Sequence, residues 1–293
     1  MKDRMATEIL KAEVLIEAIP YIRRFAGSIV VVKYGGSAMI DQQLKTSVIQ
    51  DIAMLKYLGL RPVVVHGGGK EITTLLDRLG KQSVFLDGLR VTDVETAQVA
   101  EMVLSGSIGK GLVDELQNVG LNAVGISGKD GRTLLCSRKY DEKGRDLGFV
   151  GQIDKVDTNL LHTLLDNAFI PVVSPVGVDE AGNTYNINAD YAASAVAGSL
   201  AAQKLIFLTD VEGILKDKDD PSSILRTLSK EQALSYISDG TIKGGMIPKV
   251  QCCLDGLDKG VQSVHVLDGR VPHAILLEIF TTKGVGTMVT KGE

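Results

Sequence analysis

Short runs of apolar, mostly β-branched residues recur along the chain, separated by longer stretches with helical spacing. Such runs are typical of buried strands in a parallel sheet. The expected strands lie at 28–32, 62–66, 122–126, 170–175, 204–209, 263–267 and 287–290. The expected helices between them include 97–104, 159–167, 189–200 and 249–259. This alternation predicts an α/β fold, a three-layer sandwich with a central, mainly parallel sheet covered by helices on both faces.

The first 26 residues form a separate element before the first expected core strand. Their apolar residues recur at helical spacing and include Ile9, Leu10, Val14, Ile16, Ile19, Ile22 and Phe25. Pro20 removes a backbone donor, so we expect a kinked helix. This helix either packs on its own domain or docks on another subunit. Its place ahead of the first core strand favours the second interpretation.

The remaining chain is expected to form two lobes that share one continuous sheet. No Pro/Ser-rich linker, low-complexity tract or internal repeat divides it. We place the lobes at 27–199 and 200–293, with a boundary near 199–203. The segment 149–151, preceded by several glycines, is interpreted as part of a hairpin outside the core.

Composition and charge exclude several classes of protein. The 293 residues carry 32 Lys and Arg against 36 Asp and Glu, and this mild acidity argues against a nucleic-acid partner. Cys136, Cys252 and Cys253 do not suggest a disulfide framework, which fits a reducing compartment. Acidic residues interrupt the N-terminal apolar positions, and no apolar run is long enough to span a membrane. The sequence therefore predicts a soluble, cytoplasmic protein.

Two clusters of glycine follow expected strands. Lys33 precedes Gly35 and Gly36, while His66 precedes three consecutive glycines, Gly67, Gly68 and Gly69. Consecutive glycines let the backbone approach a ligand closely, and their N–H groups can bind an anion at a helix N-terminus. Open α/β sheets bind ligands at the carboxyl ends of their strands. The pair of clusters therefore predicts phosphate or carboxylate binding.

The common nucleotide and metal motifs are absent. The pattern GxxxxGK[ST] fails around Lys110, and GxGxxG fails after Gly67, which argues against a P-loop NTPase and an ordinary dinucleotide-binding dehydrogenase. The four histidines form no HExxH pattern, and we predict no metal site built from protein side chains.

Three further segments carry candidate site residues. Arg90, which follows a turn, is suited to hold a carboxylate. Asn186 and Asp190 precede an Ala-rich helix, where either a cap or a site residue is expected. Lys249 follows Gly244 and Gly245, and alone it would be interpreted as a surface lysine. Together the three segments supply cations, a carboxylate and a carboxylate-binding group.

In these segments the chain resembles the acetylglutamate kinases of the amino-acid kinase family. The matching motifs, in the family's order, lie at 33–36, 66–69, 88–92, 186–190, 209–214 and 244–249. The resemblance covers essentially the whole chain. It implies transfer of the ATP γ-phosphoryl group to the γ-carboxylate of N-acetyl-L-glutamate, an early step of arginine biosynthesis, with Mg²⁺ bound to the ATP.

The resemblance also implies a role for each matching residue. Lys33 and Lys249 would stabilise the phosphoryl group in transfer, and Asp190 would hold both lysines. The substrate would be bound by Gly68, Gly69, Arg90 and Asn186. Phosphate would be bound by Gly35 and Gly36. The nucleotide would be lined by Thr209, Asp210, Val211, Gly213 and Lys243.

The ends of the chain resemble the arginine-inhibited, hexameric members of this family. A kinked N-terminal helix and the segment 265–287 carry this resemblance. It implies a homohexamer, a trimer of dimers, in which Glu278 and the backbone near Gly284 bind L-arginine, with a contribution from Tyr21. The alternative is a final helix and strand that only complete the sheet. A PII signalling protein, which binds some relatives, stays open as a partner.

Two other functions compete with this interpretation. Another amino-acid kinase, acting on aspartate or glutamate, would share the lysine and glycine start. A catalytically silent sensor of nucleotide or arginine would share the binding segments. The sensor is disfavoured because every charged residue that the chemistry requires is present.

Overall fold

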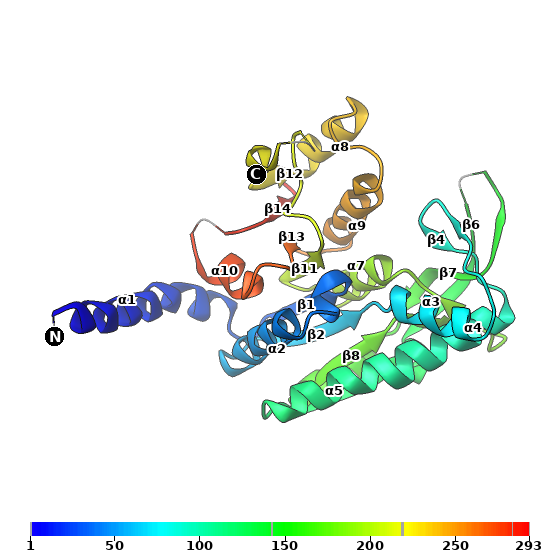
Figure 1. Cartoon of the computed structure of the whole chain (residues 1–293), viewed down its shortest axis with the longest axis horizontal. Coiled ribbons are helices and arrows are strands. Elements are labelled where there is room, and N and C mark those ends of the chain that lie inside the picture. Colours follow the sequence, from blue (N-terminus) through cyan, green and yellow to red (C-terminus); the bar gives the residue numbers. More distant parts are fainter. Residues whose placement is uncertain (1, 142, 218–219, 283, 293) are drawn as a thin grey trace.

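A large, mainly parallel sheet forms the centre of the molecule (Figure 1). The computed structural model describes residues 2–141, 143–217, 220–282 and 284–292. In spatial order, the strands of this sheet are β12 (Thr227–Ser229), β14 (Thr287–Thr290), β13 (Ser263–Asp268), β11 (Lys204–Thr209), β1 (Ile29–Tyr34), β2 (Arg61–His66), β8 (Ile170–Ser174) and β5 (Ala123–Ser127). All neighbouring pairs are parallel except β13 with β14.

The central pair β1 and β11 joins the two expected lobes. Val31 of β1 lies beside Leu205 of β11 in a parallel register, and β1 pairs on its other side with β2. The sheet therefore runs without a break from the strands of the N-terminal part to those of the C-terminal part. The boundary near 199–203 stays a prediction.

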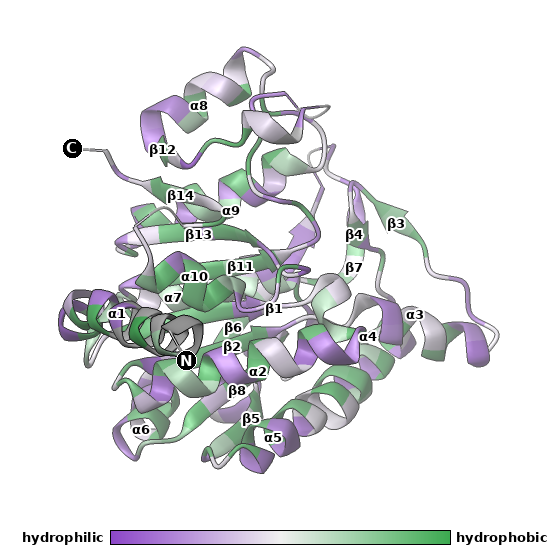
Figure 2. Ribbon diagram, turned by 60° about the vertical axis from the view of Figure 1, so that its left-hand side comes forward, coloured by the Kyte–Doolittle hydropathy of each residue, from purple (hydrophilic) through white to green (hydrophobic). Residues whose placement is uncertain are grey.

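Helices cover both faces of the sheet, which confirms the three-layer sandwich. One core contains buried side chains of α2 (Gln42–Tyr57), α5 (Gly109–Asn118) and α10 (Ala274–Phe280), together with Phe25 at the end of α1 (Lys2–Phe25). The opposite core contains those of α6 (Asn159–Asp166), α7 (Ala189–Ser199), α8 (Lys230–Ser238) and α9 (Met246–Asp258). Figure 2 shows the apolar colouring concentrated in the strands between these layers.

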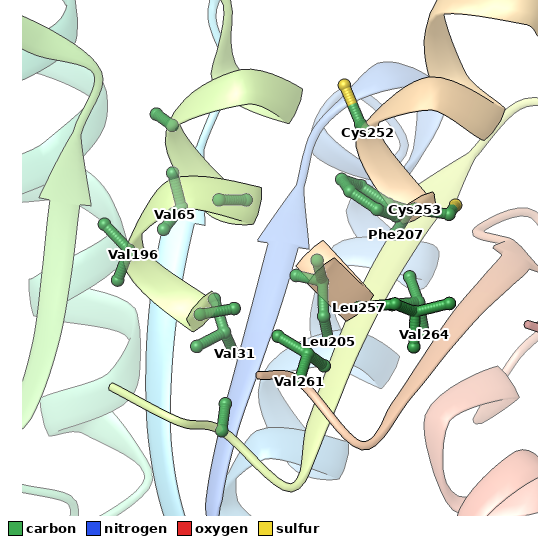
Figure 3. Packing of buried hydrophobic residues seen from close by; sticks show 14 of the residues in the cluster. Val31, Val65, Val196, Leu205, Phe207, Cys252, Cys253, Leu257, Val261 and Val264 are labelled. Atoms are coloured by element: carbon green, nitrogen blue, oxygen red, sulfur yellow. The ribbon is translucent and has the colours of Figure 1, made fainter. Parts of the chain in front are cut away.

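Successive side chains of each central strand point to opposite faces of the sheet, so they enter the two cores alternately. Val30 and Val32 belong to one core and Val31 to the other, so β1 is buried on both faces. Figure 3 shows how Val31 and Leu205 pack beneath α7 and α9, which contribute Val196 and Leu257. This packing fixes the positions of the two helices that carry Asp190 and Lys249.

A smaller β structure lies beside the main sheet. It is a closed barrel of β6 (Leu134–Tyr140), β7 (Asp146–Val156), β9 (Val176–Val178) and β10 (Thr184–Asn186). The antiparallel pairing of β6 with β7 confirms the hairpin expected around 149–151. A separate two-stranded hairpin, β3 (Phe85–Leu86) with β4 (Leu89–Arg90), follows α3 (Gly69–Arg78).

The expected strands are all present, and two helical predictions need adjustment. The helix expected at 97–104 is α4 (Val94–Glu101), which continues into a π-helical segment, η2 (Met102–Ile108). The helix expected at 249–259 begins at Met246, three residues earlier, because Gly245 ends the preceding turn in a helical conformation. A short 3-10 turn, η1 (Gly36–Met39), follows β1.

Helix α1 extends away from the body of the molecule (Figure 1). Pro20 lies within it, and Ile9, Ile16 and Ile19 are exposed. Its last turn is anchored, since Phe25 is buried in the core that also contains α10. Across the described residues, no helix is long and apolar enough to cross a membrane.

We predict that Gly148→Ala destabilises the fold by roughly 3 kcal/mol or more. Gly148 has a φ of +75°, and a Cβ there would lie 2.2 Å from the Thr92 carbonyl oxygen. That oxygen accepts a hydrogen bond from the Phe149 amide at 2.6 Å, so the backbone has little room to move. Urea unfolding of the variant and the wild type measures the difference.

Gly182→Ala is the matched control. Gly182 has a φ of +89°, but a Cβ there would meet no heavy atom within 4 Å. Only the backbone strain of about 1 kcal/mol is expected. Equal losses in the two variants would show that the close approach to Thr92 does not contribute.

Candidate active site

A carboxylate joins two lysines at the carboxyl end of the central strands. Lys33 lies in β1, Asp190 in the first turn of α7 and Lys249 in the first turn of α9. The Lys33 Nζ lies 3.0 Å from Asp190 Oδ1, and the Lys249 Nζ donates to Asp190 Oδ2 at 2.8 Å. All three side chains are partly buried. The structure therefore brings together three residues that are spread over more than 200 positions of the sequence.

The two ammonium groups keep Asp190 ionised. Burial raises the pKa of Asp190, but the charges of Lys33 and Lys249 outweigh burial and lower that pKa to about 2. The cap of α7 is a different residue, because Asn188 Oδ1 accepts from the Asp190 backbone N–H at 2.8 Å. The Asp190 side chain therefore does not cap the helix and contacts the two lysines instead.

The glycine turn after β1 lies against the same lysine. A Cβ at Gly35 would lie 2.9 Å from the Lys33 Nζ, so only glycine leaves room for the ammonium group. Gly36 has a φ of +70°, and a Cβ there would lie 2.7 Å from Asp210 Oδ1. That oxygen accepts from the Ser37 backbone N–H at 2.7 Å. Asp210, which directly follows β11, therefore holds the glycine turn that follows β1.

The second glycine cluster forms the start of α3. The Gly67 N–H donates to the Tyr34 carbonyl at 2.8 Å, which ties this cluster to the end of β1. Gly68 precedes the first helical residue, Gly69. A Cβ at Gly69 would meet no heavy atom within 4 Å, so the backbone faces open space there. This is the geometry of an anion site at a helix N-terminus.

Arg90 is held against the start of α3. Its Nη2 donates to the Gly69 carbonyl at 2.8 Å and to Thr73 Oγ1 at 2.9 Å, and its Nη1 donates to Ser83 Oγ. The guanidinium lies 4.7 Å from the centre of the Phe85 ring. Burial lowers the pKa of Arg90, but a guanidinium remains charged at neutral pH.

The residues predicted to bind the substrate line one cavity of about 190 Å³. Its lining includes Gly68, Gly69, Arg90 and Asn186. A wider adjoining cavity of about 590 Å³ also reaches Gly36. The two cavities share Gly68, Gly69 and Arg90, which places the glycine turn of β1 next to the space lined by Asn186.

The nucleotide candidates are more dispersed. Thr209 and Val211 bond to each other, because Thr209 Oγ1 donates to the Val211 carbonyl and accepts from its N–H. Gly213 packs against Thr287, whose Oγ1 would lie 2.7 Å from a Cβ at Gly213. Lys243 is exposed in the turn before α9. Only Asp210 of this group is bonded to the glycine turn.

Glu278 lies in a separate cluster near the end of α1. Its Oε1 contacts His265 Nδ1 at 2.7 Å, and its Oε2 accepts from the backbone N–H groups of Val285 and Gly286. Burial raises the pKa of Glu278, but these hydrogen bonds and His265 lower it to about 2. Gly284 must be glycine for two reasons: its φ is +59°, and a Cβ there would lie 2.6 Å from Glu278 Oε2.

Lys204 connects this cluster to α1, and the sequence analysis missed it. Its Nζ lies 3.0 Å from His265 Nε2 and 4.8 Å from the centre of the Phe25 ring. Burial lowers the pKa of Lys204 to about 8. Tyr21, one turn before Phe25, packs on the same core. In the sequence, Lys204 is marked only by its positive charge at the start of an apolar strand.

Ser37 and Thr92 were also missed. The backbone of Ser37 binds Asp210, and Thr92 Oγ1 lies 3.5 Å from Asn186 Nδ2. Thr92 lies inside the motif segment 88–92 and Ser37 directly follows the segment 33–36, but neither residue carries a charge that would single it out. Within the described part of the chain, no group of three or more His, Cys, Asp or Glu side chains could hold a metal ion.

Comparisons with known proteins show which family the chain resembles over most of its length. The model of the amino acid kinase family matches residues 28–268. The chain is 52% identical to the acetylglutamate kinase of Pelotomaculum thermopropionicum, over 98% of this chain and all of that protein. It is 50% identical to the acetylglutamate kinase of Methanocaldococcus jannaschii, over 98% of each chain.

Solved structures share the fold. The N-acetylglutamate synthase of Neisseria gonorrhoeae, in complex with coenzyme A and N-acetyl-glutamate, has a TM-score of 0.85 and 29% identity. The match covers 96% of this chain but only 64% of the synthase. The carbamate kinase of Giardia lamblia bound to AMP-PNP has a TM-score of 0.67 at 19% identity, over 91% of this chain and 99% of the kinase, a likeness of fold alone. From the family match and the full-length relatives, the chain belongs to the amino acid kinase family.

Proposed function

We propose that the chain is an acetylglutamate kinase, which transfers the ATP γ-phosphoryl group to the γ-carboxylate of N-acetyl-L-glutamate. It is a phosphotransferase with a carboxyl group as acceptor, as its relatives at about 50% identity over nearly the full chain are. The products are N-acetyl-L-glutamyl 5-phosphate and ADP. The observation that carries the proposal is the pair of ion contacts from Lys33 and Lys249 to Asp190, beside two glycine clusters.

The chemistry of the reaction explains why this site suits it. A carboxylate is already a nucleophile, so the reaction needs no general base. Two anions must nevertheless approach each other, and at 4 Å their repulsion is about 4 kcal/mol at an effective dielectric constant of 20. Transfer through a loose, in-line transition state is favoured mainly by positioning and by cations near the phosphoryl oxygens. Lys33 and Lys249 supply those cations.

Asp190 acts as a positioning residue in this proposal. Each of its oxygens contacts one ammonium group, at 3.0 Å for Lys33 and 2.8 Å for Lys249. The carboxylate offsets the repulsion between two like charges that must both face the phosphoryl group. Because the carboxylate stays ionised down to low pH, this balance holds throughout the neutral range.

The cavity next to the lysines is the proposed acetylglutamate site. The free N–H groups at the start of α3 and the guanidinium of Arg90 suit the carboxylates of this substrate. Asn186 also lines this cavity and offers an amide group there. Gly35 and Gly36 lie next to Lys33 and are proposed to bind phosphate oxygens.

ATP is proposed to bind over the C-terminal part of the sheet. Thr209, Asp210, Val211 and Gly213 follow β11, and Lys243 precedes α9. Mg²⁺ is proposed to enter with the ATP phosphates as part of the substrate. It would supply further positive charge to the phosphates, while the protein's lysines hold the transferred group.

Regulation by L-arginine is proposed at the cluster around Glu278. The carboxylate of Glu278 suits a guanidinium, and Tyr21 lies nearby, one turn before the end of α1. The exposed apolar residues of α1 support a homohexamer, a trimer of dimers in which this helix docks on a neighbouring subunit. A PII signalling protein remains a further partner to test.

An assay for hydroxamate formation from acetylglutamate, ATP and hydroxylamine tests the function. We expect product with acetylglutamate and none with aspartate or glutamate. Product with aspartate or glutamate alone would identify a different amino-acid kinase. No product from any of the three acceptors would favour a non-catalytic sensor.

Lys33→Ala and Lys249→Ala should each lower kcat by roughly 10²–10³-fold, the usual cost of removing a group that stabilises transition-state charge. Substrate binding should survive, because the glycine clusters and Arg90 remain. The matched control is Lys45→Ala, which removes an ion pair to Glu115 on the surface. A near-normal kcat in either site variant would overturn the assignment.

Asp190 should also contribute to the pH dependence of stability. Its pKa is lowered to about 2 in the folded protein from an ordinary value of 3.8, so it favours folding above about pH 4. This contribution, roughly 2 kcal/mol, is lost as the pH falls from about 4 to about 2. In Asp190→Asn, this loss of folding stability between about pH 4 and about pH 2 should be absent. Urea unfolding at a series of pH values measures it, and parallel curves for the two proteins would contradict the prediction.

Glu278→Gln should weaken inhibition by arginine by roughly tenfold or more and leave the uninhibited rate nearly unchanged. Glu231→Gln, an exposed position in the first turn of α8, is the control. Deletion of residues 1–26 should retain activity, abolish hexamers and weaken inhibition. Light scattering gives the mass of the assembly, and an intact hexamer after the deletion would refute the role of α1.

A further inference from the structure

A buried histidine and serine lie directly beneath the second glycine cluster. His66 is the last residue of β2 and Ser174 the last of β8, and the two strands are neighbours in the sheet. His66 Nδ1 lies 2.9 Å from the Gly67 carbonyl oxygen, and His66 Nε2 lies 2.9 Å from Ser174 Oγ. Both side chains are almost completely shielded from solvent. The proposed chemistry uses neither of them.

The serine contacts the π-helical segment η2 at its widened turn. The Gly109 N–H donates to the Leu104 carbonyl, five residues earlier, which is the π-helical pattern. Ser174 Oγ lies 3.1 Å from the same carbonyl oxygen. A Cβ at Gly109 would lie 3.0 Å from the Leu104 oxygen, 3.2 Å from Ser174 Oγ and 3.3 Å from His66 Nε2. The hydroxyl, the imidazole and the carbonyl therefore meet at one point.

Side chains of the π-helical segment determine the position of Gly68. A Cβ at Gly68 would lie 2.2 Å from Ile108 Cδ1 and 2.8 Å from Leu104 Cδ2. Leu104 is buried, and it also lines the cavity with Gly68 and Gly69. The segment therefore packs closely against the backbone at the start of α3. Gly67, Gly68 and Gly69, which carry the N–H groups there, line the cavity proposed to bind the substrate.

The hydrogen bonds of this pair are compatible with a neutral histidine. Burial lowers the pKa of His66 to about 4, so the ring carries one proton at neutral pH. A carbonyl oxygen only accepts, which assigns that proton to Nδ1, opposite Gly67. Nε2 is then an acceptor, and the single proton of the Ser174 hydroxyl is shared between two acceptors, Nε2 at 2.9 Å and the Leu104 carbonyl at 3.1 Å. A buried pair of this kind holds its neighbours in one arrangement.

We infer that His66 and Ser174 are positioning residues for substrate binding: through Leu104 and Ile108 they fix the glycine N–H groups that receive the acetylglutamate carboxylate. The inference rests on the proposed function and adds residues that do not touch the substrate. Their effect is expected on the KM for acetylglutamate, because the N–H groups bind that substrate and not ATP.

Steady-state kinetics of Ser174→Ala and His66→Asn test the inference. Asn keeps an N–H near the Gly67 carbonyl but does not reach Ser174. Each variant should raise the KM for acetylglutamate roughly tenfold and leave the KM for ATP within about twofold. The double variant should show no larger rise than either single one, because both changes break the same connection.

Thr133→Val is the matched control for a purely structural effect. Thr133 is completely buried, and its hydroxyl donates to the Asp130 carbonyl at 2.7 Å, away from the glycine clusters. It should lower the melting temperature without changing the KM for acetylglutamate. If Ser174→Ala and His66→Asn behave in the same way as Thr133→Val, the inference is wrong.

Ile108→Val provides a milder test that does not depend on a buried polar group. It removes the Cδ1 atom that lies closest to Gly68 and should also raise the KM for acetylglutamate selectively. An unchanged KM for acetylglutamate in this variant would contradict the proposed role of the packing of Ile108 against Gly68. A wild-type protein that phosphorylates no acetylglutamate would instead refute the proposed function, and this inference with it.

Discussion

The contact of one carboxylate with two ammonium groups is the constraint on which the site depends. Lys33 and Lys249 lie on different elements and would repel each other at close range. The negative charge of Asp190 offsets that repulsion. Burial raises the pKa of Asp190, and the charges of the two lysines lower it again. The lysines therefore keep Asp190 ionised, and the ionised Asp190 in turn holds the lysines close together. Because each partner lies on a different element, the arrangement requires that β1, α7 and α9 keep their positions to within a hydrogen-bond distance.

The core meets that requirement from the opposite side of the same elements. Helices α7 and α9 pack on each other through Ser194, whose hydroxyl donates to the Cys252 carbonyl at 2.8 Å. Cys253 of α9 and Phe207 of β11 are fully buried between the helix and the sheet. Burial raises the pKa of Cys253 to about 12, so this thiol is a packing group and not a nucleophile. The positions of the two helices are therefore fixed by contacts that are separate from the polar site.

Much of this architecture could be predicted from the sequence, because buried strands carry continuous apolar runs. The bounds of β11 and β14 agree with the predicted runs, and the pattern also indicated helices on both faces. Short strands such as β9 and β10, three residues each, carry too few residues for a period to emerge. The sequence pattern predicts ordinary helix up to residue 104, and it gives no signal of the π-helical segment, whose Leu104 carbonyl accepts from Ser174, a residue distant in sequence.

The candidate site was predicted unevenly for a related reason. Lys33 stood out because it precedes two glycines at the end of an expected strand, whereas Lys249 and Asp190 were assigned through the motifs that resemble the family. Lys204 did not stand out, because its environment comes from Phe25 and His265, which only the fold brings to it. Motifs identify groups that act on a ligand. They do not reveal groups whose importance arises from tertiary packing.

The position of the two clusters on β11 limits how an effector can act. Lys204 begins this strand and faces the cluster of Glu278, while Asp210 follows its last residue and binds the glycine turn. A strand rises about 3.3 Å per residue, so the two ends lie roughly 17–20 Å apart. A small effector bound at Glu278 therefore cannot touch the glycine turn after β1, which is proposed to bind phosphate. Its proposed influence would have to arise from a change in how α1, α10 and the sheet pack, with Asp210 as the point where β11 meets that turn.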